Sequence, residues 1–83
     1  MIKLTITTIG GNTVIFDDSK TAGSGMSALT QLVAKQMIHA IADMSGTPTE
    51  VYIPFHAICE AECEKDGTVV PITDDLCGGA VNP

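Results

Sequence analysis

Three cysteines and a histidine in the second half of the chain are the residue types best suited to chemistry: His56, Cys59, Cys63 and Cys77. Thiolates and imidazoles bind zinc, and a thiol beside a histidine can act as a nucleophile. On a strand, however, Cys59 and Cys63 would lie about 13 Å apart, too far to share one metal ion. We therefore predict no metal site. The odd number of cysteines, the lack of a secretory signal and the same spacing, which is too long for a Cys59–Cys63 disulfide, predict three free thiols. A thiol or small metal protein that uses His56 and the cysteines is kept as an alternative.

A second candidate site is the loop before the longest periodic segment. Gly23, Ser24 and Gly25 lead into a predicted helix, and Lys20 is the nearby cation. The N–H groups and positive dipole at a helix N-terminus can hold a phosphate or carboxylate. The loop lacks the Gly-Lys-Ser/Thr ending of a phosphate loop. A small anion or nucleotide binder that uses these four residues is therefore a second alternative.

Glu60, Glu62 and Glu64 share one face if their segment is extended. Paired carboxylates perform acid–base chemistry when their surroundings separate their pKa values. A solvated face that discourages aggregation of a sheet edge is the simpler interpretation. We predict that the protein is not an enzyme, has no catalytic residues and uses no cofactor.

One long helix over residues 26–44 is predicted to organise the chain. At about 100° per residue, its apolar side chains form a single stripe. We expect this stripe to be the core, and Leu29→Ala or Val33→Ala to be strongly destabilising. The stripe contains Met26, Leu29, Val33, Met37, Ala40 and Met44, with Ile38 and Ile41 beside it.

Strands are predicted on both sides of this helix. Apolar and polar residues alternate over residues 2–8 and 13–17, and the turn-forming residues 10–12 between them indicate a β-hairpin. Residues 50–58 alternate again, but Pro54 cannot donate to a ladder, which indicates an edge or bulged strand.

Residues 57–65 fit two structures. Their composition favours a helix, whereas their alternation favours a strand. The hairpin turn Asp66-Gly67 and the β-branched run over 68–73 favour the strand. The predicted fold is therefore α+β: a single helix on a small, mostly antiparallel sheet in the order β-β-α-β-β, with a fifth strand as an open alternative. We predict one domain over residues 1–83, with residues 76–83 as a loose tail.

Composition restricts the partners. The 83 residues carry ten carboxylates and four Lys, for a net charge of −6, and no Arg. Nucleic-acid recognition relies on Arg and basic patches, so direct nucleic-acid binding is disfavoured. No apolar run reaches the length of a membrane span, and no secretory signal is visible. Together with the odd number of cysteines, these observations indicate a cytoplasmic protein without a membrane partner.

Self-association is the last expectation. A chain this short has a small core, and the predicted helix carries more apolar surface than one small sheet can cover. We place the contact on the helix flank at Leu32, Lys35, Ile38 and His39. The leading hypothesis is a small, acidic, non-catalytic binding or inhibitory accessory protein that acts through its surface as a homo-oligomer. Its partner is a protein or a small anionic ligand, and its size and character are typical of phage and mobile-element proteins.

Overall fold

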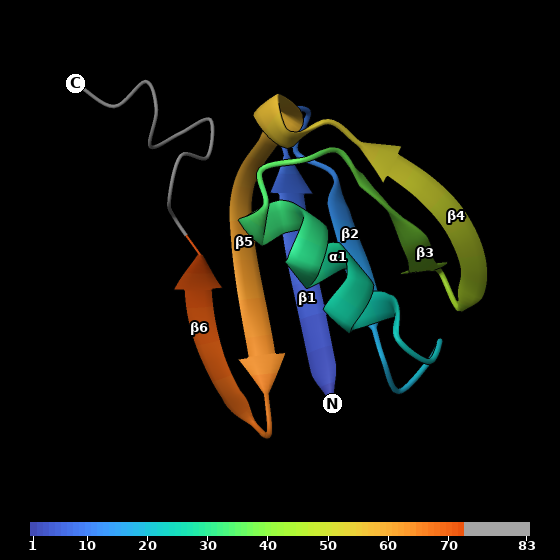
Figure 1. Cartoon of the computed structure of the whole chain (residues 1–83). Coiled ribbons are helices and arrows are strands. Elements are labelled where there is room, and N and C mark those ends of the chain that lie inside the picture. The colour runs from blue at the N-terminus through green and yellow to red at the C-terminus, as the bar shows by residue number, and fades with distance from the viewer. Residues whose placement is uncertain (73–83) are drawn as a thin grey trace.

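The computed structural model describes residues 1–72. Its fold is α+β, with one helix packed on antiparallel sheets, as predicted (Figure 1). The predicted tail over residues 76–83 lies outside the described residues. The elements in chain order are β1 (Ile2–Thr8), β2 (Thr13–Asp17), α1 (Ser24–Val33), β3 (Ile38–Met44), β4 (Thr47–Ile53), the 3₁₀ helix η1 (Phe55–Ala57), β5 (Ile58–Lys65) and β6 (Thr68–Ile72).

The strands form two hydrogen-bonded groups. A four-stranded antiparallel sheet has the order β2-β1-β5-β6, and β3 and β4 form a separate antiparallel hairpin. Figure 1 shows α1 across one face of the larger sheet, with the β3–β4 hairpin on the side of β2. Within the described residues, no helix has the length and apolar character needed to cross a bilayer.

The core lies between α1 and the sheet, and the β3–β4 hairpin closes its side. The largest fully buried side chains are Leu4, Ile6, Phe16, Ile38 and Ile58. Because side chains alternate along a strand, the same period that buries Leu4 and Ile6 leaves Lys3, Thr5 and Thr7 on the opposite face. The predicted hairpin of β1 and β2 is thereby confirmed.

The long helix over residues 26–44 is wrong, because α1 ends at Val33. Lys35 has a φ of 59°, in the left-handed region. Its N–H bonds the Leu32 carbonyl at 2.9 Å, and the Gln36 N–H bonds the Gln31 carbonyl at 3.0 Å. This pair of bonds is the Schellman motif that ends many helices. Glycine is the usual residue at this left-handed position, so the lysine in the sequence did not predict the end of the helix.

The second half of the predicted helix is strand β3. The sequence of these residues fits an alternating pattern as well as a helical one. In β3, Ile38, Ala40 and Ala42 are buried, whereas His39 is exposed. Two residues with positive φ, Ser45 (55°) and Gly46 (84°), then form the turn into β4. The two residues that follow the predicted helix are therefore the turn of a hairpin.

In the C-terminal half of the chain, two predicted strands are confirmed and one is corrected. Residues 58–65 are a strand, as the alternation indicated, and β6 supplies the additional strand left open. The predicted strand over residues 50–58 is divided at Pro54. Strand β4 ends at Ile53, and the chain passes through η1 before β5 begins.

Candidate functional site

The predicted anion site at the start of α1 is occupied by the chain's own carboxylate. Gly23 precedes the helix and has no side chain to cap it. Asp18 takes this role: its Oδ1 accepts the N–H groups of Gly25 at 2.7 Å and Met26 at 3.2 Å. Its Oδ2 accepts the N–H of Ile2 at 3.2 Å. The positive end of the helix therefore already faces a negative charge.

The other residues of that predicted site serve the fold. Ser24 is buried, and its hydroxyl donates to the backbone carbonyl of Ile41 on β3. A Cβ on Gly25 would lie 2.2 Å from the Ile2 carbonyl oxygen, so only glycine fits there. Lys20 is exposed. The N–H groups on which the anion-binding alternative depends are thus bonded to Asp18.

The two apolar residues of the predicted self-association contact are buried. Leu32 is 2% exposed and Ile38 is 0% exposed, and both belong to the core. Lys35 and His39 are exposed, but Lys35 lies in the turn after α1 and His39 lies on β3. The error follows directly from the helix boundary, because a helix continued through Ile38 placed core residues on its outer flank.

His39 instead belongs to a polar cluster on the outside of the hairpin. Its Nε2 lies 2.7 Å from Glu50 Oε2. Its ring stacks on Tyr52, with centroids 4.1 Å apart and planes 16° apart. The side-chain amide of Gln31 on α1 accepts the His39 N–H at 2.8 Å and donates to the His39 carbonyl at 3.0 Å. The ring contacts a carboxylate and an aromatic face, whereas a nucleophilic triad needs a hydroxyl or thiol there.

The cysteines differ from one another. Cys59 is disulfide-bonded, whereas Cys63 is a free thiol packed partly against the core. The prediction of three free thiols is therefore wrong, and the argument for a cytosolic location from reduced thiols loses its basis. Cys77 lies outside the described residues. Among residues 1–72, His, Cys, Asp and Glu form no group of three able to hold a metal ion.

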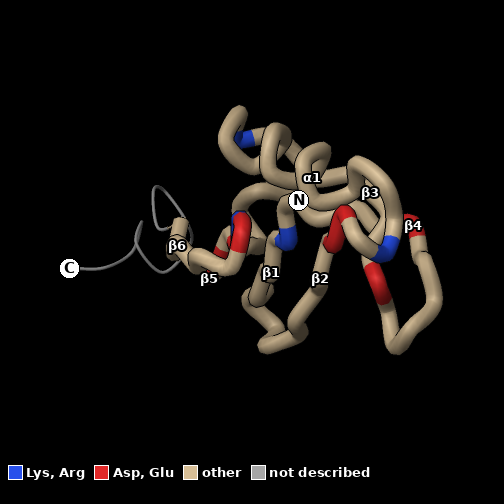
Figure 2. The backbone as a smooth tube through the Cα atoms, turned by 90° about the horizontal axis from the view of Figure 1, so that it is seen from below, with Lys and Arg blue, Asp and Glu red and all other residues tan. Residues whose placement is uncertain are grey.

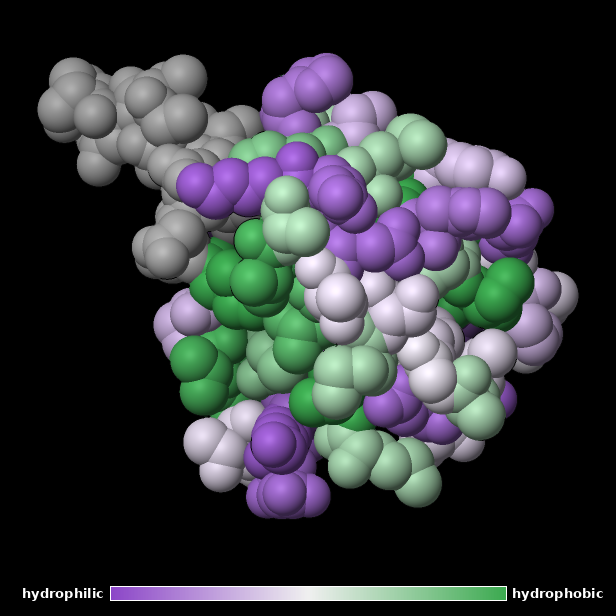
Figure 3. All heavy atoms as spheres, in the orientation of Figure 1, coloured by the Kyte–Doolittle hydropathy of each residue, from purple (hydrophilic) through white to green (hydrophobic). Residues whose placement is uncertain are grey.

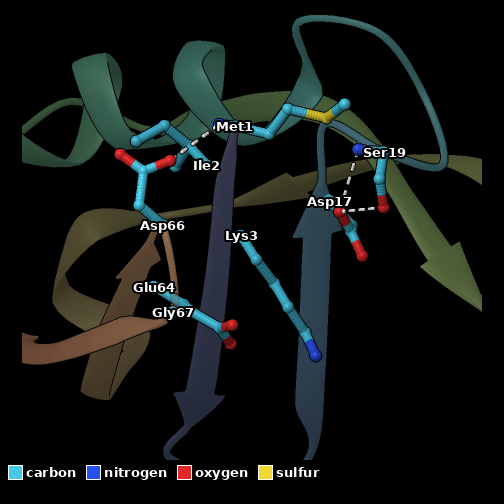
Figure 4. Close-up of a pocket in the computed structure, with 8 residues that line it drawn as sticks. All are labelled: Met1, Ile2, Lys3, Asp17, Ser19, Glu64, Asp66 and Gly67. Atoms are coloured by element: carbon cyan, nitrogen blue, oxygen red, sulfur yellow. Dashed lines mark hydrogen bonds and ion pairs between the residues drawn. The ribbon is translucent and has the colours of Figure 1, made fainter.

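An open pocket of about 420 Å³, lined by charged, polar and apolar residues, lies where β1 and β2 meet the β5–β6 turn (Figure 4). The side chain of Lys3 extends along it, and Glu64 and Asp66 come from the far side. Asp17 accepts the Ser19 hydroxyl at 2.7 Å and the Ser19 N–H at 2.9 Å. These bonds, helped by the charges of Lys3 and Lys20, lower the pKa of Asp17 below 3.8.

This pocket holds charges of both signs in an exposed setting. The Met1 ammonium lies 3.9 Å from Asp66, with both groups exposed. Figure 2 shows Asp and Glu residues along both sheets rather than at one place. The net negative charge is therefore a property of the whole described surface, and not of one acidic site.

The strongest candidate is an apolar surface between α1 and β6. We define the apolar face as Met26, Leu29 and Val33 on the helix together with Cys63, Val70 and Ile72 on the sheet. Val33 is 67% exposed, Val70 53% and Met26 50%, while the other three are partly buried against the core. Figure 3 shows hydrophobic side chains gathered at this place, between the helix and the edge strand.

The arrangement of α1 explains why this face is open. Ser24 and Gln31 point from one flank of the helix toward β3, to which both are hydrogen-bonded. At about 100° per residue, Leu29, Val33 and Met26 lie on the opposite flank, toward β5 and β6. The sequence assigned these three residues to the buried stripe. Met26 and Val33 are exposed because Ala28 and Leu32 form the buried face of α1 instead.

Comparison with known proteins gives no match to a family model, to a curated protein or to a solved structure.

Proposed function

We propose that the protein is a small, acidic, non-catalytic protein-binding module whose binding surface is the apolar face. The observation that carries the proposal is the exposure of Met26, Val33 and Val70 on one side of the molecule. Contiguous apolar surface is rarely left open on a soluble domain unless it binds something. This retains the hypothesis of an accessory protein that acts through its surface.

The chemistry of the apolar face favours a protein as its partner. A small polar ligand needs a few convergent polar groups to orient it, and the six side chains offer one thiol and no charge. A net charge of −6 opposes nucleic acids and anionic membrane surfaces. A protein surface with an apolar centre can bind without such polar groups and need not carry a negative charge.

Strand β6 provides a matched pair of variants to test this. Val70 lies on the apolar face, opposite Cys63, whereas Val69 lies on the other face, opposite Glu64. Their exposed fractions are 53% and 52%. Val70→Lys introduces a charge into the apolar face, and Val69→Lys introduces the same charge elsewhere on the same strand, with the same exposure.

The experiment is affinity capture with tagged wild type and both variants from cells of the natural source, followed by quantitative mass spectrometry. We expect a protein captured by wild type and by Val69→Lys to fall at least tenfold with Val70→Lys. Circular dichroism checks that both variants fold. Equal capture by the two variants, or no capture by any of the three, contradicts the proposal.

A further inference from the structure

Open strand edges are places where a second chain can add hydrogen bonds, and the described residues contain two. The outer edge of β3 is occupied, because Gln31 bonds both backbone groups of His39 and Ser24 bonds the Ile41 carbonyl. Strand β2 lies beside β3. The outer edges of β4 and β6 remain, and Figure 1 shows both at opposite ends of the molecule.

The hairpin turns determine which backbone groups point outward. In a two-residue hairpin, the pair next to the turn exchanges hydrogen bonds, and bonded and non-bonded pairs alternate from there. The β3–β4 turn joins Met44 to Thr47. Along β4, Pro48, Glu50 and Tyr52 therefore direct their backbone groups away from β3. The same rule directs the groups of His39 and Ile41 away from β4, as their bonds to α1 confirm.

The two open edges differ in their donors. On β6, the rule directs Val69 and Pro71 outward, and Pro71 has no N–H, so that edge offers one donor. On β4, the N–H groups of Glu50 and Tyr52 both point outward, with Pro48 before them. Pro54 follows in an extended conformation, with φ −63° and ψ 142°. Strand β4 therefore presents two donors between two prolines.

We propose that β4 binds a second copy of itself, antiparallel and centred on Val51, to make a two-fold dimer. In this register, Glu50 of each chain lies opposite Tyr52 of the second copy. The two pairs exchange four N–H···O bonds. Pro48 lies opposite Pro54 of the second copy, so the residues without an N–H face each other and each Glu50–Tyr52 pair keeps both of its hydrogen bonds. The hairpins join into one four-stranded antiparallel sheet.

The neighbouring register is much poorer. Centring the pairing on Glu50 places that carboxylate against its own copy, and like charges directly opposite each other are destabilising. It also pairs Pro48 with Tyr52, which loses a hydrogen bond at each end. The prolines and Glu50 thus select one register for an isologous contact, in which both subunits use the same residues.

This inference is independent of the proposed function, because β4 and the apolar face are different surfaces. It replaces the predicted contact through Leu32 and Ile38, which are buried. A dimer through β4 leaves the apolar face of each subunit available to a partner. Val70→Lys should therefore leave the dimer unchanged, so the two proposals can fail separately.

The first test measures mass by sedimentation equilibrium between micromolar and millimolar protein. Wild type should reach twice the chain mass of 8.6 kDa. Glu50→Pro removes one outward N–H without removing a bond to β3, and it should weaken the dimer at least tenfold. Val69→Pro makes the same change on β6 and should leave the dimer intact. A wild-type monomer at all concentrations, or a Glu50→Pro dimer of undiminished affinity, overturns the proposal.

The second test reads the register and does not depend on a proline variant that folds. Facing residues of a non-hydrogen-bonded pair have Cα atoms about 4.5 Å apart, within reach of a disulfide. In a Cys63→Ser background, Val51→Cys should form a covalent dimer on mild oxidation. Glu50→Cys is the matched control and should not, because its copy lies two residues further along. Cross-linking through Glu50→Cys in place of Val51→Cys overturns the register, and cross-linking through neither overturns the contact.

Discussion

Gly25 shows how closely the helix approaches the sheet. A substituted Cβ would lie 2.2 Å from the Ile2 carbonyl oxygen and 3.0 Å from that of Phe16. Backbone atoms cannot move aside as a flexible side chain can, so α1 would have to lift from β1 and β2.

We therefore predict that Gly25→Ala destabilises the fold by about 2 kcal/mol, because overpacking outweighs the gain of about 1 kcal/mol in helix propensity. Urea unfolding measures the change. Thr30→Ala, at an exposed position of the same helix, should be neutral or stabilising. Equal stability of Gly25→Ala and wild type would mean that the helix sits further from the sheet than described.

Asp17 contributes a pH-dependent term to stability. Its pKa in the folded state is lowered below 3.8, first by the Ser19 hydroxyl and then by the Ser19 N–H. The ionised form therefore stabilises the fold above pH 3.8, and this contribution is lost as the pH falls through the lowered pKa.

Ser19→Ala removes the largest of these causes and should raise the pKa of Asp17 toward 3.8. The loss of stability on acidification should then be smaller than in wild type. Carboxyl-detected NMR titration measures the pKa, with Thr30→Ala as the control. A titration of Asp17 unaffected by Ser19→Ala would assign the lowered pKa to the remaining bond and the two lysines.

At the scale of elements, α1 has an inner face that differs from the predicted stripe. Leu32 is buried in the core, whereas Val33, the next residue, is 67% exposed. We predict that Leu32→Ala lowers the free energy of unfolding by about 3 kcal/mol, because it leaves a cavity, and that Val33→Ala changes it little. Urea melts of the two variants decide this, and equal losses would restore the predicted stripe.

The strands were more predictable than the helix, for a physical reason. Alternation over residues 2–8 and 13–17 has one structural interpretation, and over residues 57–65 the hairpin turn that follows favours a strand over a helix. Residues 38–44 fit both a helical and an extended period, and tertiary contacts decide between them. Gln31 illustrates this, since its bonds to the His39 backbone need a strand that local sequence does not specify.

The candidate sites were less predictable than the fold. Gly23, Ser24 and Gly25 were correctly placed at the start of the helix, but the carboxylate that fills the site, Asp18, comes from the preceding loop. The apolar face combines residues from α1, β5 and β6, and it depends on where α1 ends. The local sequence indicated only the β-branched run over 68–73, which includes Val70 and Ile72.

At the scale of the whole molecule, the two described cysteines differ in oxidation state. Cys59 is disulfide-bonded and Cys63 is not. Alkylation of the denatured, non-reduced protein should therefore label Cys63 at once and Cys59 after reduction. Peptide mapping by mass spectrometry locates the labels. Labelling of Cys59 without reductant would contradict the disulfide.

The attachment of the β3–β4 hairpin has a consequence for how the molecule opens. Its bonds to α1 come from the side chains of Gln31 and Ser24, whereas β1 and β5 share a backbone ladder. We therefore predict that the hairpin opens as one cooperative unit at a lower free energy than global unfolding. Its amides should exchange with solvent deuterium earlier than those between β1 and β5, and Gln31→Ala should widen that gap. Pairing of β4 with a second copy would slow the exchange of the hairpin amides.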